Sequence, residues 1–371
     1  MKHEYLVVGT GLVGATIART LADAGHTVLA VERRAHSGGN VHDSLHDSGI
    51  RMHDHGPHYF RTGSASLWAF VRRFASFYPY EARILSRIDG ELQGWPVTAS
   101  YLRQSGIRVD DVTPQAKPRN FESAMLARMP RAIFERFVKD YTEKQWGVPV
   151  HTLDERLAAR IPIRYDDDPR LTPRARYQGL PTNGYSAMIS AMLDGIPVEL
   201  GVDYLAHRDY LRPSALTVFT GPIDEYFCFS LGRLKYRAQR RTTTYHADVD
   251  WYQPVSQVNE PQHSGGTHIR TLEWKHMMQP AELARVAGTL ITCETPFTPE
   301  NSDDYEYPFP DKANRALYLR YREMANRSAD TLICGRLGEY RYYDMDQAIA
   351  RARVLAGRIL QHGPASTRTA Y

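Results

Sequence analysis

The stretch of sequence that decides the fold is Val7-Val8-Gly9-Thr10-Gly11-Leu12-Val13-Gly14, followed by Val28-Leu29-Ala30-Val31-Glu32. It predicts an apolar strand, a glycine turn, a helix and a second apolar strand that ends in an acid. In such a unit Gly9 permits the tight turn, Gly11 lets the backbone approach a pyrophosphate, and Gly14 lets helix and strand pack closely. The helix N-terminus offers N–H groups to phosphates, and Glu32 is placed to accept hydrogen bonds from a ribose. The stretch therefore predicts a dinucleotide site; a glycine-rich turn without a ligand is the alternative.

A second glycine turn indicates which dinucleotide is bound. Arg33, Arg34 and Gly38-Gly39-Asn40 come directly after Glu32. This turn lets more backbone close around the cofactor, a pattern similar to that of FAD proteins of the glutathione reductase type, whereas NAD dehydrogenases seldom need it. We therefore expect FAD, and the residues expected to hold it here are Gly9, Gly11, Leu12, Gly14, Glu32, Arg33, Gly39 and Asn40.

Composition narrows the class of protein. The 371 residues suffice for two or three packed units, and 42% of them are hydrophobic, as in ordinary globular proteins. The net charge of +4 suits anionic small molecules. The basic run Arg233–Arg241 is open to a nucleic-acid interpretation, but its alternation favours one charged face of a strand, so we expect no nucleic-acid partner.

Cysteine, membrane and metal signals are weak. The 3 cysteines are isolated from one another, which argues against a disulfide framework. No signal peptide precedes the first strand and no apolar run reaches membrane-spanning length, so we expect a cytoplasmic protein with no membrane partner. His53, His55 and His58 match no zinc spacing, and we predict no metal.

Periodicity predicts helical and strand-rich regions along the rest of the chain. We expect a helix over 65–77, short strands within 82–98, and helices from about 100 to 178. The charged, proline-containing segment 165–174 predicts a mobile loop. Strands dominate 198–310, and a last strand turns through Gly335 into a helix that begins near Met345.

Five segments together resemble the UDP-galactopyranose mutase family: Gly56–Thr62, Tyr141–Gly147, Arg160–Arg164, Thr220–Asp224 and Gly335–Met345. They lie in the family's order and, with the dinucleotide stretch, span nearly the whole chain. The most specific are Tyr-Thr-Glu-Lys-Gln-Trp over 141–146 and Gly-Arg-Leu…Tyr-Tyr-Asp-Met over 335–345.

The resemblance implies an α/β fold with a Rossmann-like FAD-binding domain of the glutathione reductase type, an inserted helical domain and an antiparallel sheet domain. The expected FAD domain covers 1–80, 179–212 and 311–371. The helical domain covers 95–178, with a mobile substrate lid at about 160–176, and the sheet domain covers 81–94 and 213–310. Family members are often dimers, so a homodimer is expected.

The resemblance also implies a reaction, the interconversion of pyranose and furanose forms of a nucleotide-diphospho-sugar, with UDP-galactose as the default. In the family, N5 of reduced FAD attacks the anomeric carbon and displaces the nucleotide. The sugar ring then recloses by way of a flavin-iminium intermediate, without net redox change. A leaving diphosphate gains negative charge, so fixed guanidinium and phenol groups around it accelerate the step.

The family's functional positions carry over residue by residue. Arg160 and Arg270 match its diphosphate-clamping arginines, and Tyr307 and Tyr342 match its phosphate-contacting tyrosines. The residues expected at the substrate are Phe137, Tyr141, Trp146, Arg160, Arg270, Tyr307 and Tyr342. Those expected near the flavin ring are His58, Arg336, Asp344 and Met345, and His58 is also expected to act in catalysis.

Other interpretations remain open for these residues. Tyr141 and Trp146 suit the core at a helix end, Arg160 suits a solvated surface, and Asp344 suits a helix cap. Two other function classes are an amine-oxidase-like flavin oxidoreductase and a flavin-bearing binding protein. The oxidoreductase would not need the 141–146 segment or the paired arginines. Against the binding protein, whose catalytic site would have decayed, stand five intact site residues: Arg160, Arg270, Arg336, Tyr307 and Tyr342.

Several departures from the family pattern concern the substrate. Arg61 stands where the family has a histidine, Gly94–Thr98 lacks two side-chain amides, and the lid's tyrosine has no clean equivalent. Asp140 precedes the base-stacking position, where its carboxylate would select a base such as guanine or point to water. The departures leave another UDP-, GDP- or dTDP-linked sugar open as the substrate.

Overall fold

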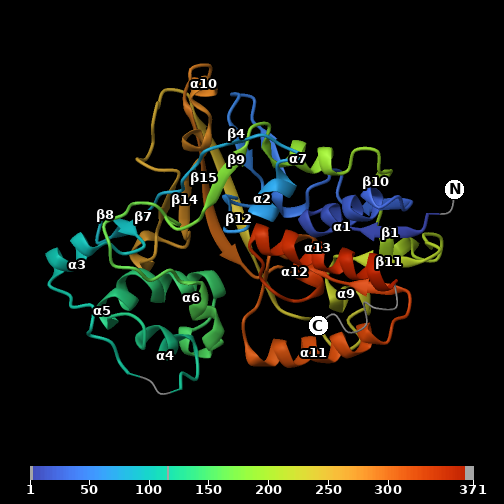
Figure 1. Cartoon of the computed structure of the whole chain (residues 1–371). Coiled ribbons are helices and arrows are strands. Elements are labelled where there is room, and N and C mark those ends of the chain that lie inside the picture. The colour runs from blue at the N-terminus through green and yellow to red at the C-terminus, as the bar shows by residue number, and fades with distance from the viewer. Residues whose placement is uncertain (1–2, 115–116, 364–371) are drawn as a thin grey trace.

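The computed structural model describes residues 3–114 and 117–363 of the chain (Figure 1). The predicted domain ranges also include 1–2, 115–116 and 364–371, which lie outside the described residues. In Figure 1 a group of short helices, α3 to α6, lies to the left, a long sheet stands in the middle, and the glycine-rich N-terminal unit lies to the right with α13.

A five-stranded parallel sheet forms the right-hand part of the molecule. Its strand order is β10-β2-β1-β11-β17, with bounds Val198–Leu200, Val28–Glu32, Tyr5–Val8, Leu216–Phe219 and Thr331–Ile333. The predicted helix between the first two strands is α1, Leu12–Asp23, which packs in one core with α13, Met345–His362, and α7, Gly184–Met192. The Rossmann-like prediction is confirmed, because strands far apart in the chain complete the sheet that Gly9–Glu32 begins.

A seven-stranded sheet stands between the two ends of the molecule. Its order is β16-β12-β15-β14-β13-β7-β8, with bounds Tyr307–Pro308, Tyr236–His246, Thr289–Phe297, Arg270–Glu273, Gln257–Asn259, Ile84–Ile88 and Glu91–Trp95. All neighbouring pairs are antiparallel except β13 and β7, which run parallel, so the predicted antiparallel sheet is in fact mixed. The hairpin β7–β8 comes from far upstream in the chain and joins at the free edge of β13.

Short helices build a second core on the left of Figure 1. They are α3 Ala99–Ser105, α4 Phe121–Leu126, α5 Arg131–Ile133, a π-helical turn Phe134–Lys139, α6 Asp140–Trp146, and the 3-10 turns Val150–Thr152 and Glu155–Arg160. Gly147 ends α6 with φ of +68°, the left-handed conformation that glycine adopts most readily. The predicted helical region and its glycine stop are therefore confirmed.

Small sheets and remaining helices connect these parts. The sheets are β3 Asp43–Leu45 with β4 Arg51–His53, and β5 Phe60–Thr62, β9 Tyr177–Pro181 and β6 Phe77–Tyr78. The helices and turns are Gly39–Val41, α2 Ala65–Val71, α8 Tyr204–His207, α9 Ile223–Tyr226, His263–Gly265, Trp274–Met277, α10 Pro280–Leu283, Ser302–Asp304, α11 Lys312–Asn326 and α12 Gly335–Gly338. No helix among the described residues combines the length and the apolar character needed to cross a membrane.

One local prediction was wrong, and another holds only in part. The helix expected to reach Phe77 ends at Val71, because Phe77 and Tyr78 pair with β9, a partner more than ninety positions further along the chain. The run Arg233–Arg241 is only partly a solvent-facing charged strand: the strand begins at Tyr236, and the exposed basic residues are Arg233, Lys235 and Arg240. Arg237 is only 6% exposed, and its Nε and Nη1 donate to the Gln145 carbonyl at 2.7 Å and the Thr298 hydroxyl at 2.6 Å.

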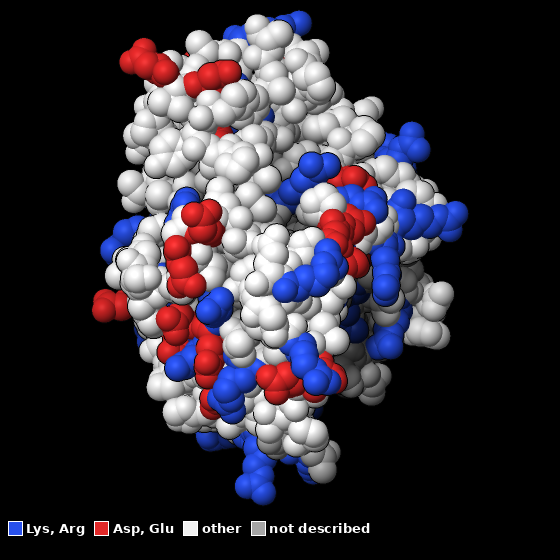
Figure 2. Space-filling model, turned by 90° about the vertical axis from the view of Figure 1, so that its left-hand side faces the viewer, with Lys and Arg blue, Asp and Glu red and all other residues white. Residues whose placement is uncertain are grey.

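Charge on the face that carries the helical part is mixed. Figure 2 shows acidic and basic side chains intermingled over much of this face. A nucleic-acid surface typically gathers lysine and arginine into one basic stripe or patch. The face drawn in Figure 2 carries both charge signs and no such single stripe.

Candidate active site

The residues predicted to hold a dinucleotide meet at one cavity of about 290 Å³. It opens at the carboxyl ends of β1, β2, β11 and β17, where an open α/β sheet binds its ligand. All twelve predicted cofactor residues line it: Gly9, Gly11, Leu12, Gly14, Glu32, Arg33, Gly39, Asn40, His58, Arg336, Asp344 and Met345. The lining shows where these residues lie; the part each plays in binding stays a prediction.

Glycines bring the chain close together around this cavity. A Cβ on Gly14 would lie 1.8 Å from the Gly9 carbonyl oxygen, so only glycine lets α1 start this close to β1. The two glycine turns also touch, because a Cβ on Gly39 would lie 3.0 Å from the Gly11 Cα, and Gly11 pairs with Gly38 as a β-bridge. The resulting backbone cradle fits a dinucleotide pyrophosphate.

The acid at the end of β2 is held rigidly. Glu32 is 7% exposed, and one of its oxygens accepts from the Thr10 amide at 2.9 Å and the Thr10 hydroxyl at 3.0 Å. Its other oxygen accepts from the Arg34 amide at 3.1 Å. An ionised carboxylate has about four acceptor positions, so room remains for a ribose hydroxyl.

The opposite end of the cavity contains His58 and the start of α13. Burial, with His53 as a second cause, holds the pKa of His58 well below its ordinary value, so the imidazole is neutral. The His58 amide donates to His53 Nδ1 at 3.0 Å, and the Tyr185 hydroxyl donates to the His58 carbonyl at 3.1 Å. Asp344 occupies the N-cap of α13, so the capping interpretation holds while its carboxylate pairs with Arg61 at 3.2 Å.

A second, larger cavity of about 1200 Å³ adjoins the first. Five of the predicted substrate residues line it: Trp146, Arg160, Arg270, Tyr307 and Tyr342. Six residues line both cavities: Pro57, Tyr59, Arg61, Tyr342, Tyr343 and Asp344. The two cavities therefore lie next to each other.

Cationic and aromatic side chains are stacked in the large cavity. The Arg160 guanidinium carbon lies 3.3 Å from the ring centre of Tyr342, and that ring stacks on Tyr307 at 6.2 Å and 13°. Arg270 comes from β14 on the other side and is paired with the fully buried Glu294. Burial raises the pKa of Tyr307, so its phenol stays protonated and can donate to an anion.

Phe137 and Tyr141 lie apart from the lining of the two cavities. Phe137 is 4% exposed and packs in the helical core, stacked on Trp95 at 6.1 Å. Burial raises the pKa of Tyr141, with Arg270 as a weaker opposing influence. Their substrate contacts stay predictions, and Phe137 is part of the hydrophobic core of the helical region.

Lys144 has a structural role that the sequence pattern did not reveal. A surface helix pair with Glu143 is the usual expectation for such a residue, yet Lys144 is 8% exposed. Its Nζ donates to the carbonyls of Glu260, Gln262 and His268, at 2.9, 2.6 and 3.3 Å. The lysine therefore ties α6 to the loop before β14, and no local signal marks such carbonyl acceptors.

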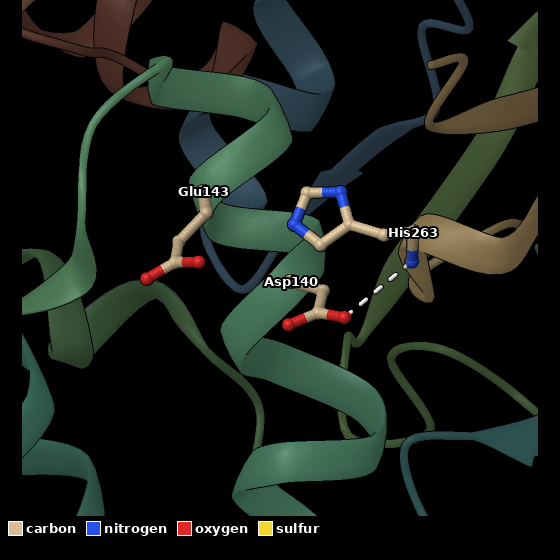
Figure 3. A group of neighbouring side chains, drawn as sticks. All are labelled: Asp140, Glu143 and His263. Carbon is tan, nitrogen blue, oxygen red and sulfur yellow. Dashed lines mark hydrogen bonds between the residues drawn. The ribbon is translucent and has the colours of Figure 1, made fainter. Parts of the chain in front are cut away.

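Asp140, Glu143 and His263 form a group of ligand-type side chains beside that loop (Figure 3). Their ligand atoms lie within 4.8 Å of one another. Local structure accounts for both acids, because Glu143 accepts from the Val150 amide at 3.2 Å and Asp140 from the His263 amide at 3.4 Å. Asp140 thus faces the His263 loop and does not line the large cavity.

The fold is that of a dinucleotide-binding protein of the Rossmann class, with a second, larger cavity next to the one at the strand ends. Family models agree with this division: an NAD(P)-binding Rossmann-like domain matches residues 7–74, and the UDP-galactopyranose mutase model matches residues 136–342. The chain belongs to the UDP-galactopyranose mutase family, whose members are isomerases, and membership implies a flavin cofactor.

Individual relatives show how far the likeness extends. A probable UDP-galactopyranose mutase of Klebsiella pneumoniae is 30% identical over 97% of this chain and 95% of its own. A dTDP-fucopyranose mutase of Escherichia coli is 26% identical over 94% of this chain and 96% of its own. A crystal structure of reduced UDP-galactopyranose mutase matches 100% of this chain and 97% of its own with a TM-score of 0.75 and 13% identity, which shows the shared fold.

Proposed function

We propose that this protein interconverts the pyranose and furanose forms of a nucleotide-diphospho-sugar, with UDP-galactose as the default substrate and reduced FAD as cofactor. The observation that carries the proposal is that the two cavities adjoin and share lining residues. Residues predicted for the cofactor line one, residues predicted for the diphosphate line the other, and Tyr342 and Asp344 line both.

The residues of the large cavity suit a leaving diphosphate. Arg160 and Arg270 approach from different elements, so an anion between them is neutralised from two sides. Guanidinium groups that are held in place stabilise charge as it develops, without the cost of reorganising water. Tyr307 and Tyr342 add phenol donors beside the arginines.

The small cavity suits a flavin whose reactive edge faces the sugar. When bound and reduced, the flavin supplies the nucleophile for the anomeric carbon. The chain contributes a neutral His58 and the Arg61–Asp344 pair at the junction with the sugar. A neutral imidazole there avoids repelling the cationic character that develops on the sugar carbon.

A variant of this proposal has a nucleotide-sugar other than UDP-galactose as the substrate. The positions at which this chain departs from the family pattern favour that variant. Arg61 places a permanent cation where the two cavities join, and a relative named dTDP-fucopyranose mutase is nearly as similar as the relatives named for UDP-galactose. A change of sugar or base therefore stays within the family's chemistry.

Turnover by dithionite-reduced protein on UDP-, GDP- and dTDP-linked pyranoses and furanoses, followed by chromatography, tests the proposal. We expect conversion of UDP-galactofuranose to the pyranose. Conversion of another nucleotide-sugar alone would change the substrate and keep the reaction class. No conversion of any of them by protein with bound, reducible FAD would overturn the proposal.

A further inference from the structure

A buried cluster of alternating charges lies behind the predicted diphosphate clamp. It consists of Arg270 on β14, Glu294 on β15, Arg241 on β12 and Glu306 just before β16. The three strands are adjacent, and Glu294 lies directly opposite Arg270 on one side and opposite Arg241 on the other. Side chains at such positions on one face are close enough to pair.

Glu294 is shared between the two arginines. Its side chain is fully buried, one oxygen accepts from Arg241 Nε at 2.9 Å, and the other accepts from Arg270 Nε. Arg241 is held from behind as well, since its Nη1 and Nη2 donate to the two oxygens of Glu306 at 2.7 and 3.0 Å. Arg241 thus donates its hydrogen bonds to acceptors within the protein, and it lines neither of the two cavities.

Arg270 differs from Arg241 in where its donors go. Only its Nε is used by Glu294, and among the described residues its Nη groups have no hydrogen-bond partner. The loop above restricts it further, because a Cβ on Gly56 would lie 2.8 Å from Glu294 Oε1 and 3.1 Å from Arg270 Nη2. The same observation shows that this Nη2 lies near the oxygen that Arg241 occupies.

We propose that Arg241 is a positioning residue for Arg270. Its bond to one oxygen holds the Glu294 carboxylate in an orientation that meets Arg270 at Nε alone, in place of the two-pronged pair that arginine and carboxylate prefer. The Nη groups of Arg270 then remain available to a diphosphate in the large cavity. The inference rests on the proposed function, because it assumes that Arg270 binds the substrate's diphosphate.

Binding of UDP to the oxidised holoenzyme, measured by calorimetry, tests this assignment. We expect Arg241→Gln to raise the Kd for UDP at least tenfold, while the FAD content per protein stays that of the wild type. Arg241→Lys keeps the charge but cannot contact both acids as a fork, so we expect an intermediate Kd. Arg240→Gln is the matched control, since Arg240 lies on the other face of β12, exposed and 5.3 Å from the Phe297 ring, and should leave the Kd within twofold.

Two further variants keep the result interpretable. Arg241→Gln leaves the buried acids Glu294 and Glu306 without their partner, and the variant could lose FAD for that reason. In that case the isosteric variant Glu306→Gln tests the positioning role of Arg241 instead. It should raise the Kd severalfold with FAD retained. Wild-type affinity for UDP in either FAD-loaded variant would overturn the inference. Arg270→Ala, measured in the same way, separates the role of Arg241 from the role of Arg270. If Arg270→Ala loses affinity for UDP while the Arg241 and Glu306 variants bind normally, only the role of Arg241 is excluded. If Arg270→Ala itself binds UDP normally, Arg270 does not bind the diphosphate.

Discussion

At the scale of single residues, the two arginines predicted to clamp the diphosphate are held in different ways. Arg160 rests on the face of Tyr342, whereas Arg270 is anchored through its Nε by a buried carboxylate. A cation on an aromatic face can slide, but a guanidinium fixed to a buried acid keeps its direction. We therefore expect Arg270 to be the group that defines where the diphosphate lies.

Arg270→Ala should retain FAD and a native fold yet lose most turnover. A single preorganised donor of this kind contributes about 3 kcal/mol to transition-state stabilisation, which corresponds to a loss of roughly a hundredfold in kcat. Steady-state turnover of the reduced variant, normalised to bound FAD, gives the comparison. Turnover at the wild-type level would exclude Arg270 from the clamp.

Asp224 is predicted to make the stability of the protein depend on pH. The residue is fully buried in α9, one oxygen accepts from the Leu234 amide at 2.9 Å, and the other has no hydrogen-bond partner among the described residues. Burial raises the pKa of this carboxyl to about 6. The native state therefore holds the proton more tightly than the unfolded chain does, so this stability is fully present below about pH 4 and is lost as the pH rises through 6.

Asp224→Asn removes this titration and should flatten the dependence. The whole shift corresponds to about 3 kcal/mol, of which about 2 kcal/mol is lost between pH 4.5 and 7.5, so the Tm of the variant relative to the wild type should increase over that range. Thermal unfolding of both proteins across that range measures it. A Tm difference that stays constant with pH would show that Asp224 ionises normally in the folded protein.

At the scale of elements, the predicted lid is held at identifiable points. Asp167 accepts from the Ser100 amide at 2.7 Å, and the Leu171 amide donates to the Ala82 carbonyl at 2.8 Å. The Ser100 hydroxyl is the main cause that lowers the pKa of Asp167, to about 2. Beyond these points, Arg174 and Arg176 are exposed.

Trypsin should therefore cut first after Arg174 or Arg176, within the stretch from Tyr165 onwards. A bound nucleotide-sugar should slow this cleavage, since a lid that closes over its ligand leaves the protease less access. Mass spectrometry of a time course with and without UDP-galactose identifies the site and the rate. Cleavage at an unchanged rate with ligand would count against the lid. Cleavage of an unrelated protein with and without UDP-galactose is the control for inhibition of trypsin itself.

Elements also show why part of the sequence-based prediction failed. The helix expected through Phe77 has the right local periodicity up to Val71, but β6 forms because β9 lies next to it. The same holds for Arg237, whose acceptors are on α6 and beyond β15. Periodicity within one segment predicts a helix or strand well and cannot register a partner supplied from far away.

At the scale of the whole molecule, the proposed reaction needs both the sheet with the glycine turns and the seven-stranded sheet with the helical region, because each lines one of the two cavities. The glycine-rich sheet lines the cavity predicted for the cofactor, and β14, β16 and the 3-10 turn that ends at Arg160 line the cavity predicted for the substrate. Protein with oxidised flavin should thus bind nucleotide-sugar and fail to turn it over, whereas dithionite should restore turnover. Anaerobic assays at a known flavin absorbance test this, and turnover by strictly oxidised protein would exclude a role for the reduced flavin as nucleophile.

The sequence by itself determined the dinucleotide-binding unit, the helical region with its glycine stop, and the family to which the chain belongs. These signals are local: glycine spacing, an acid at a strand end and short motifs lie within a few tens of residues, and backbone sterics give them one meaning. Only the tertiary structure decided which side chains share a cavity and which are buried against one another. Glu294, Arg241 and Arg270 come from three strands, and their pairing depends on strand register. Register is set by the packing of the whole sheet, which no single segment contains.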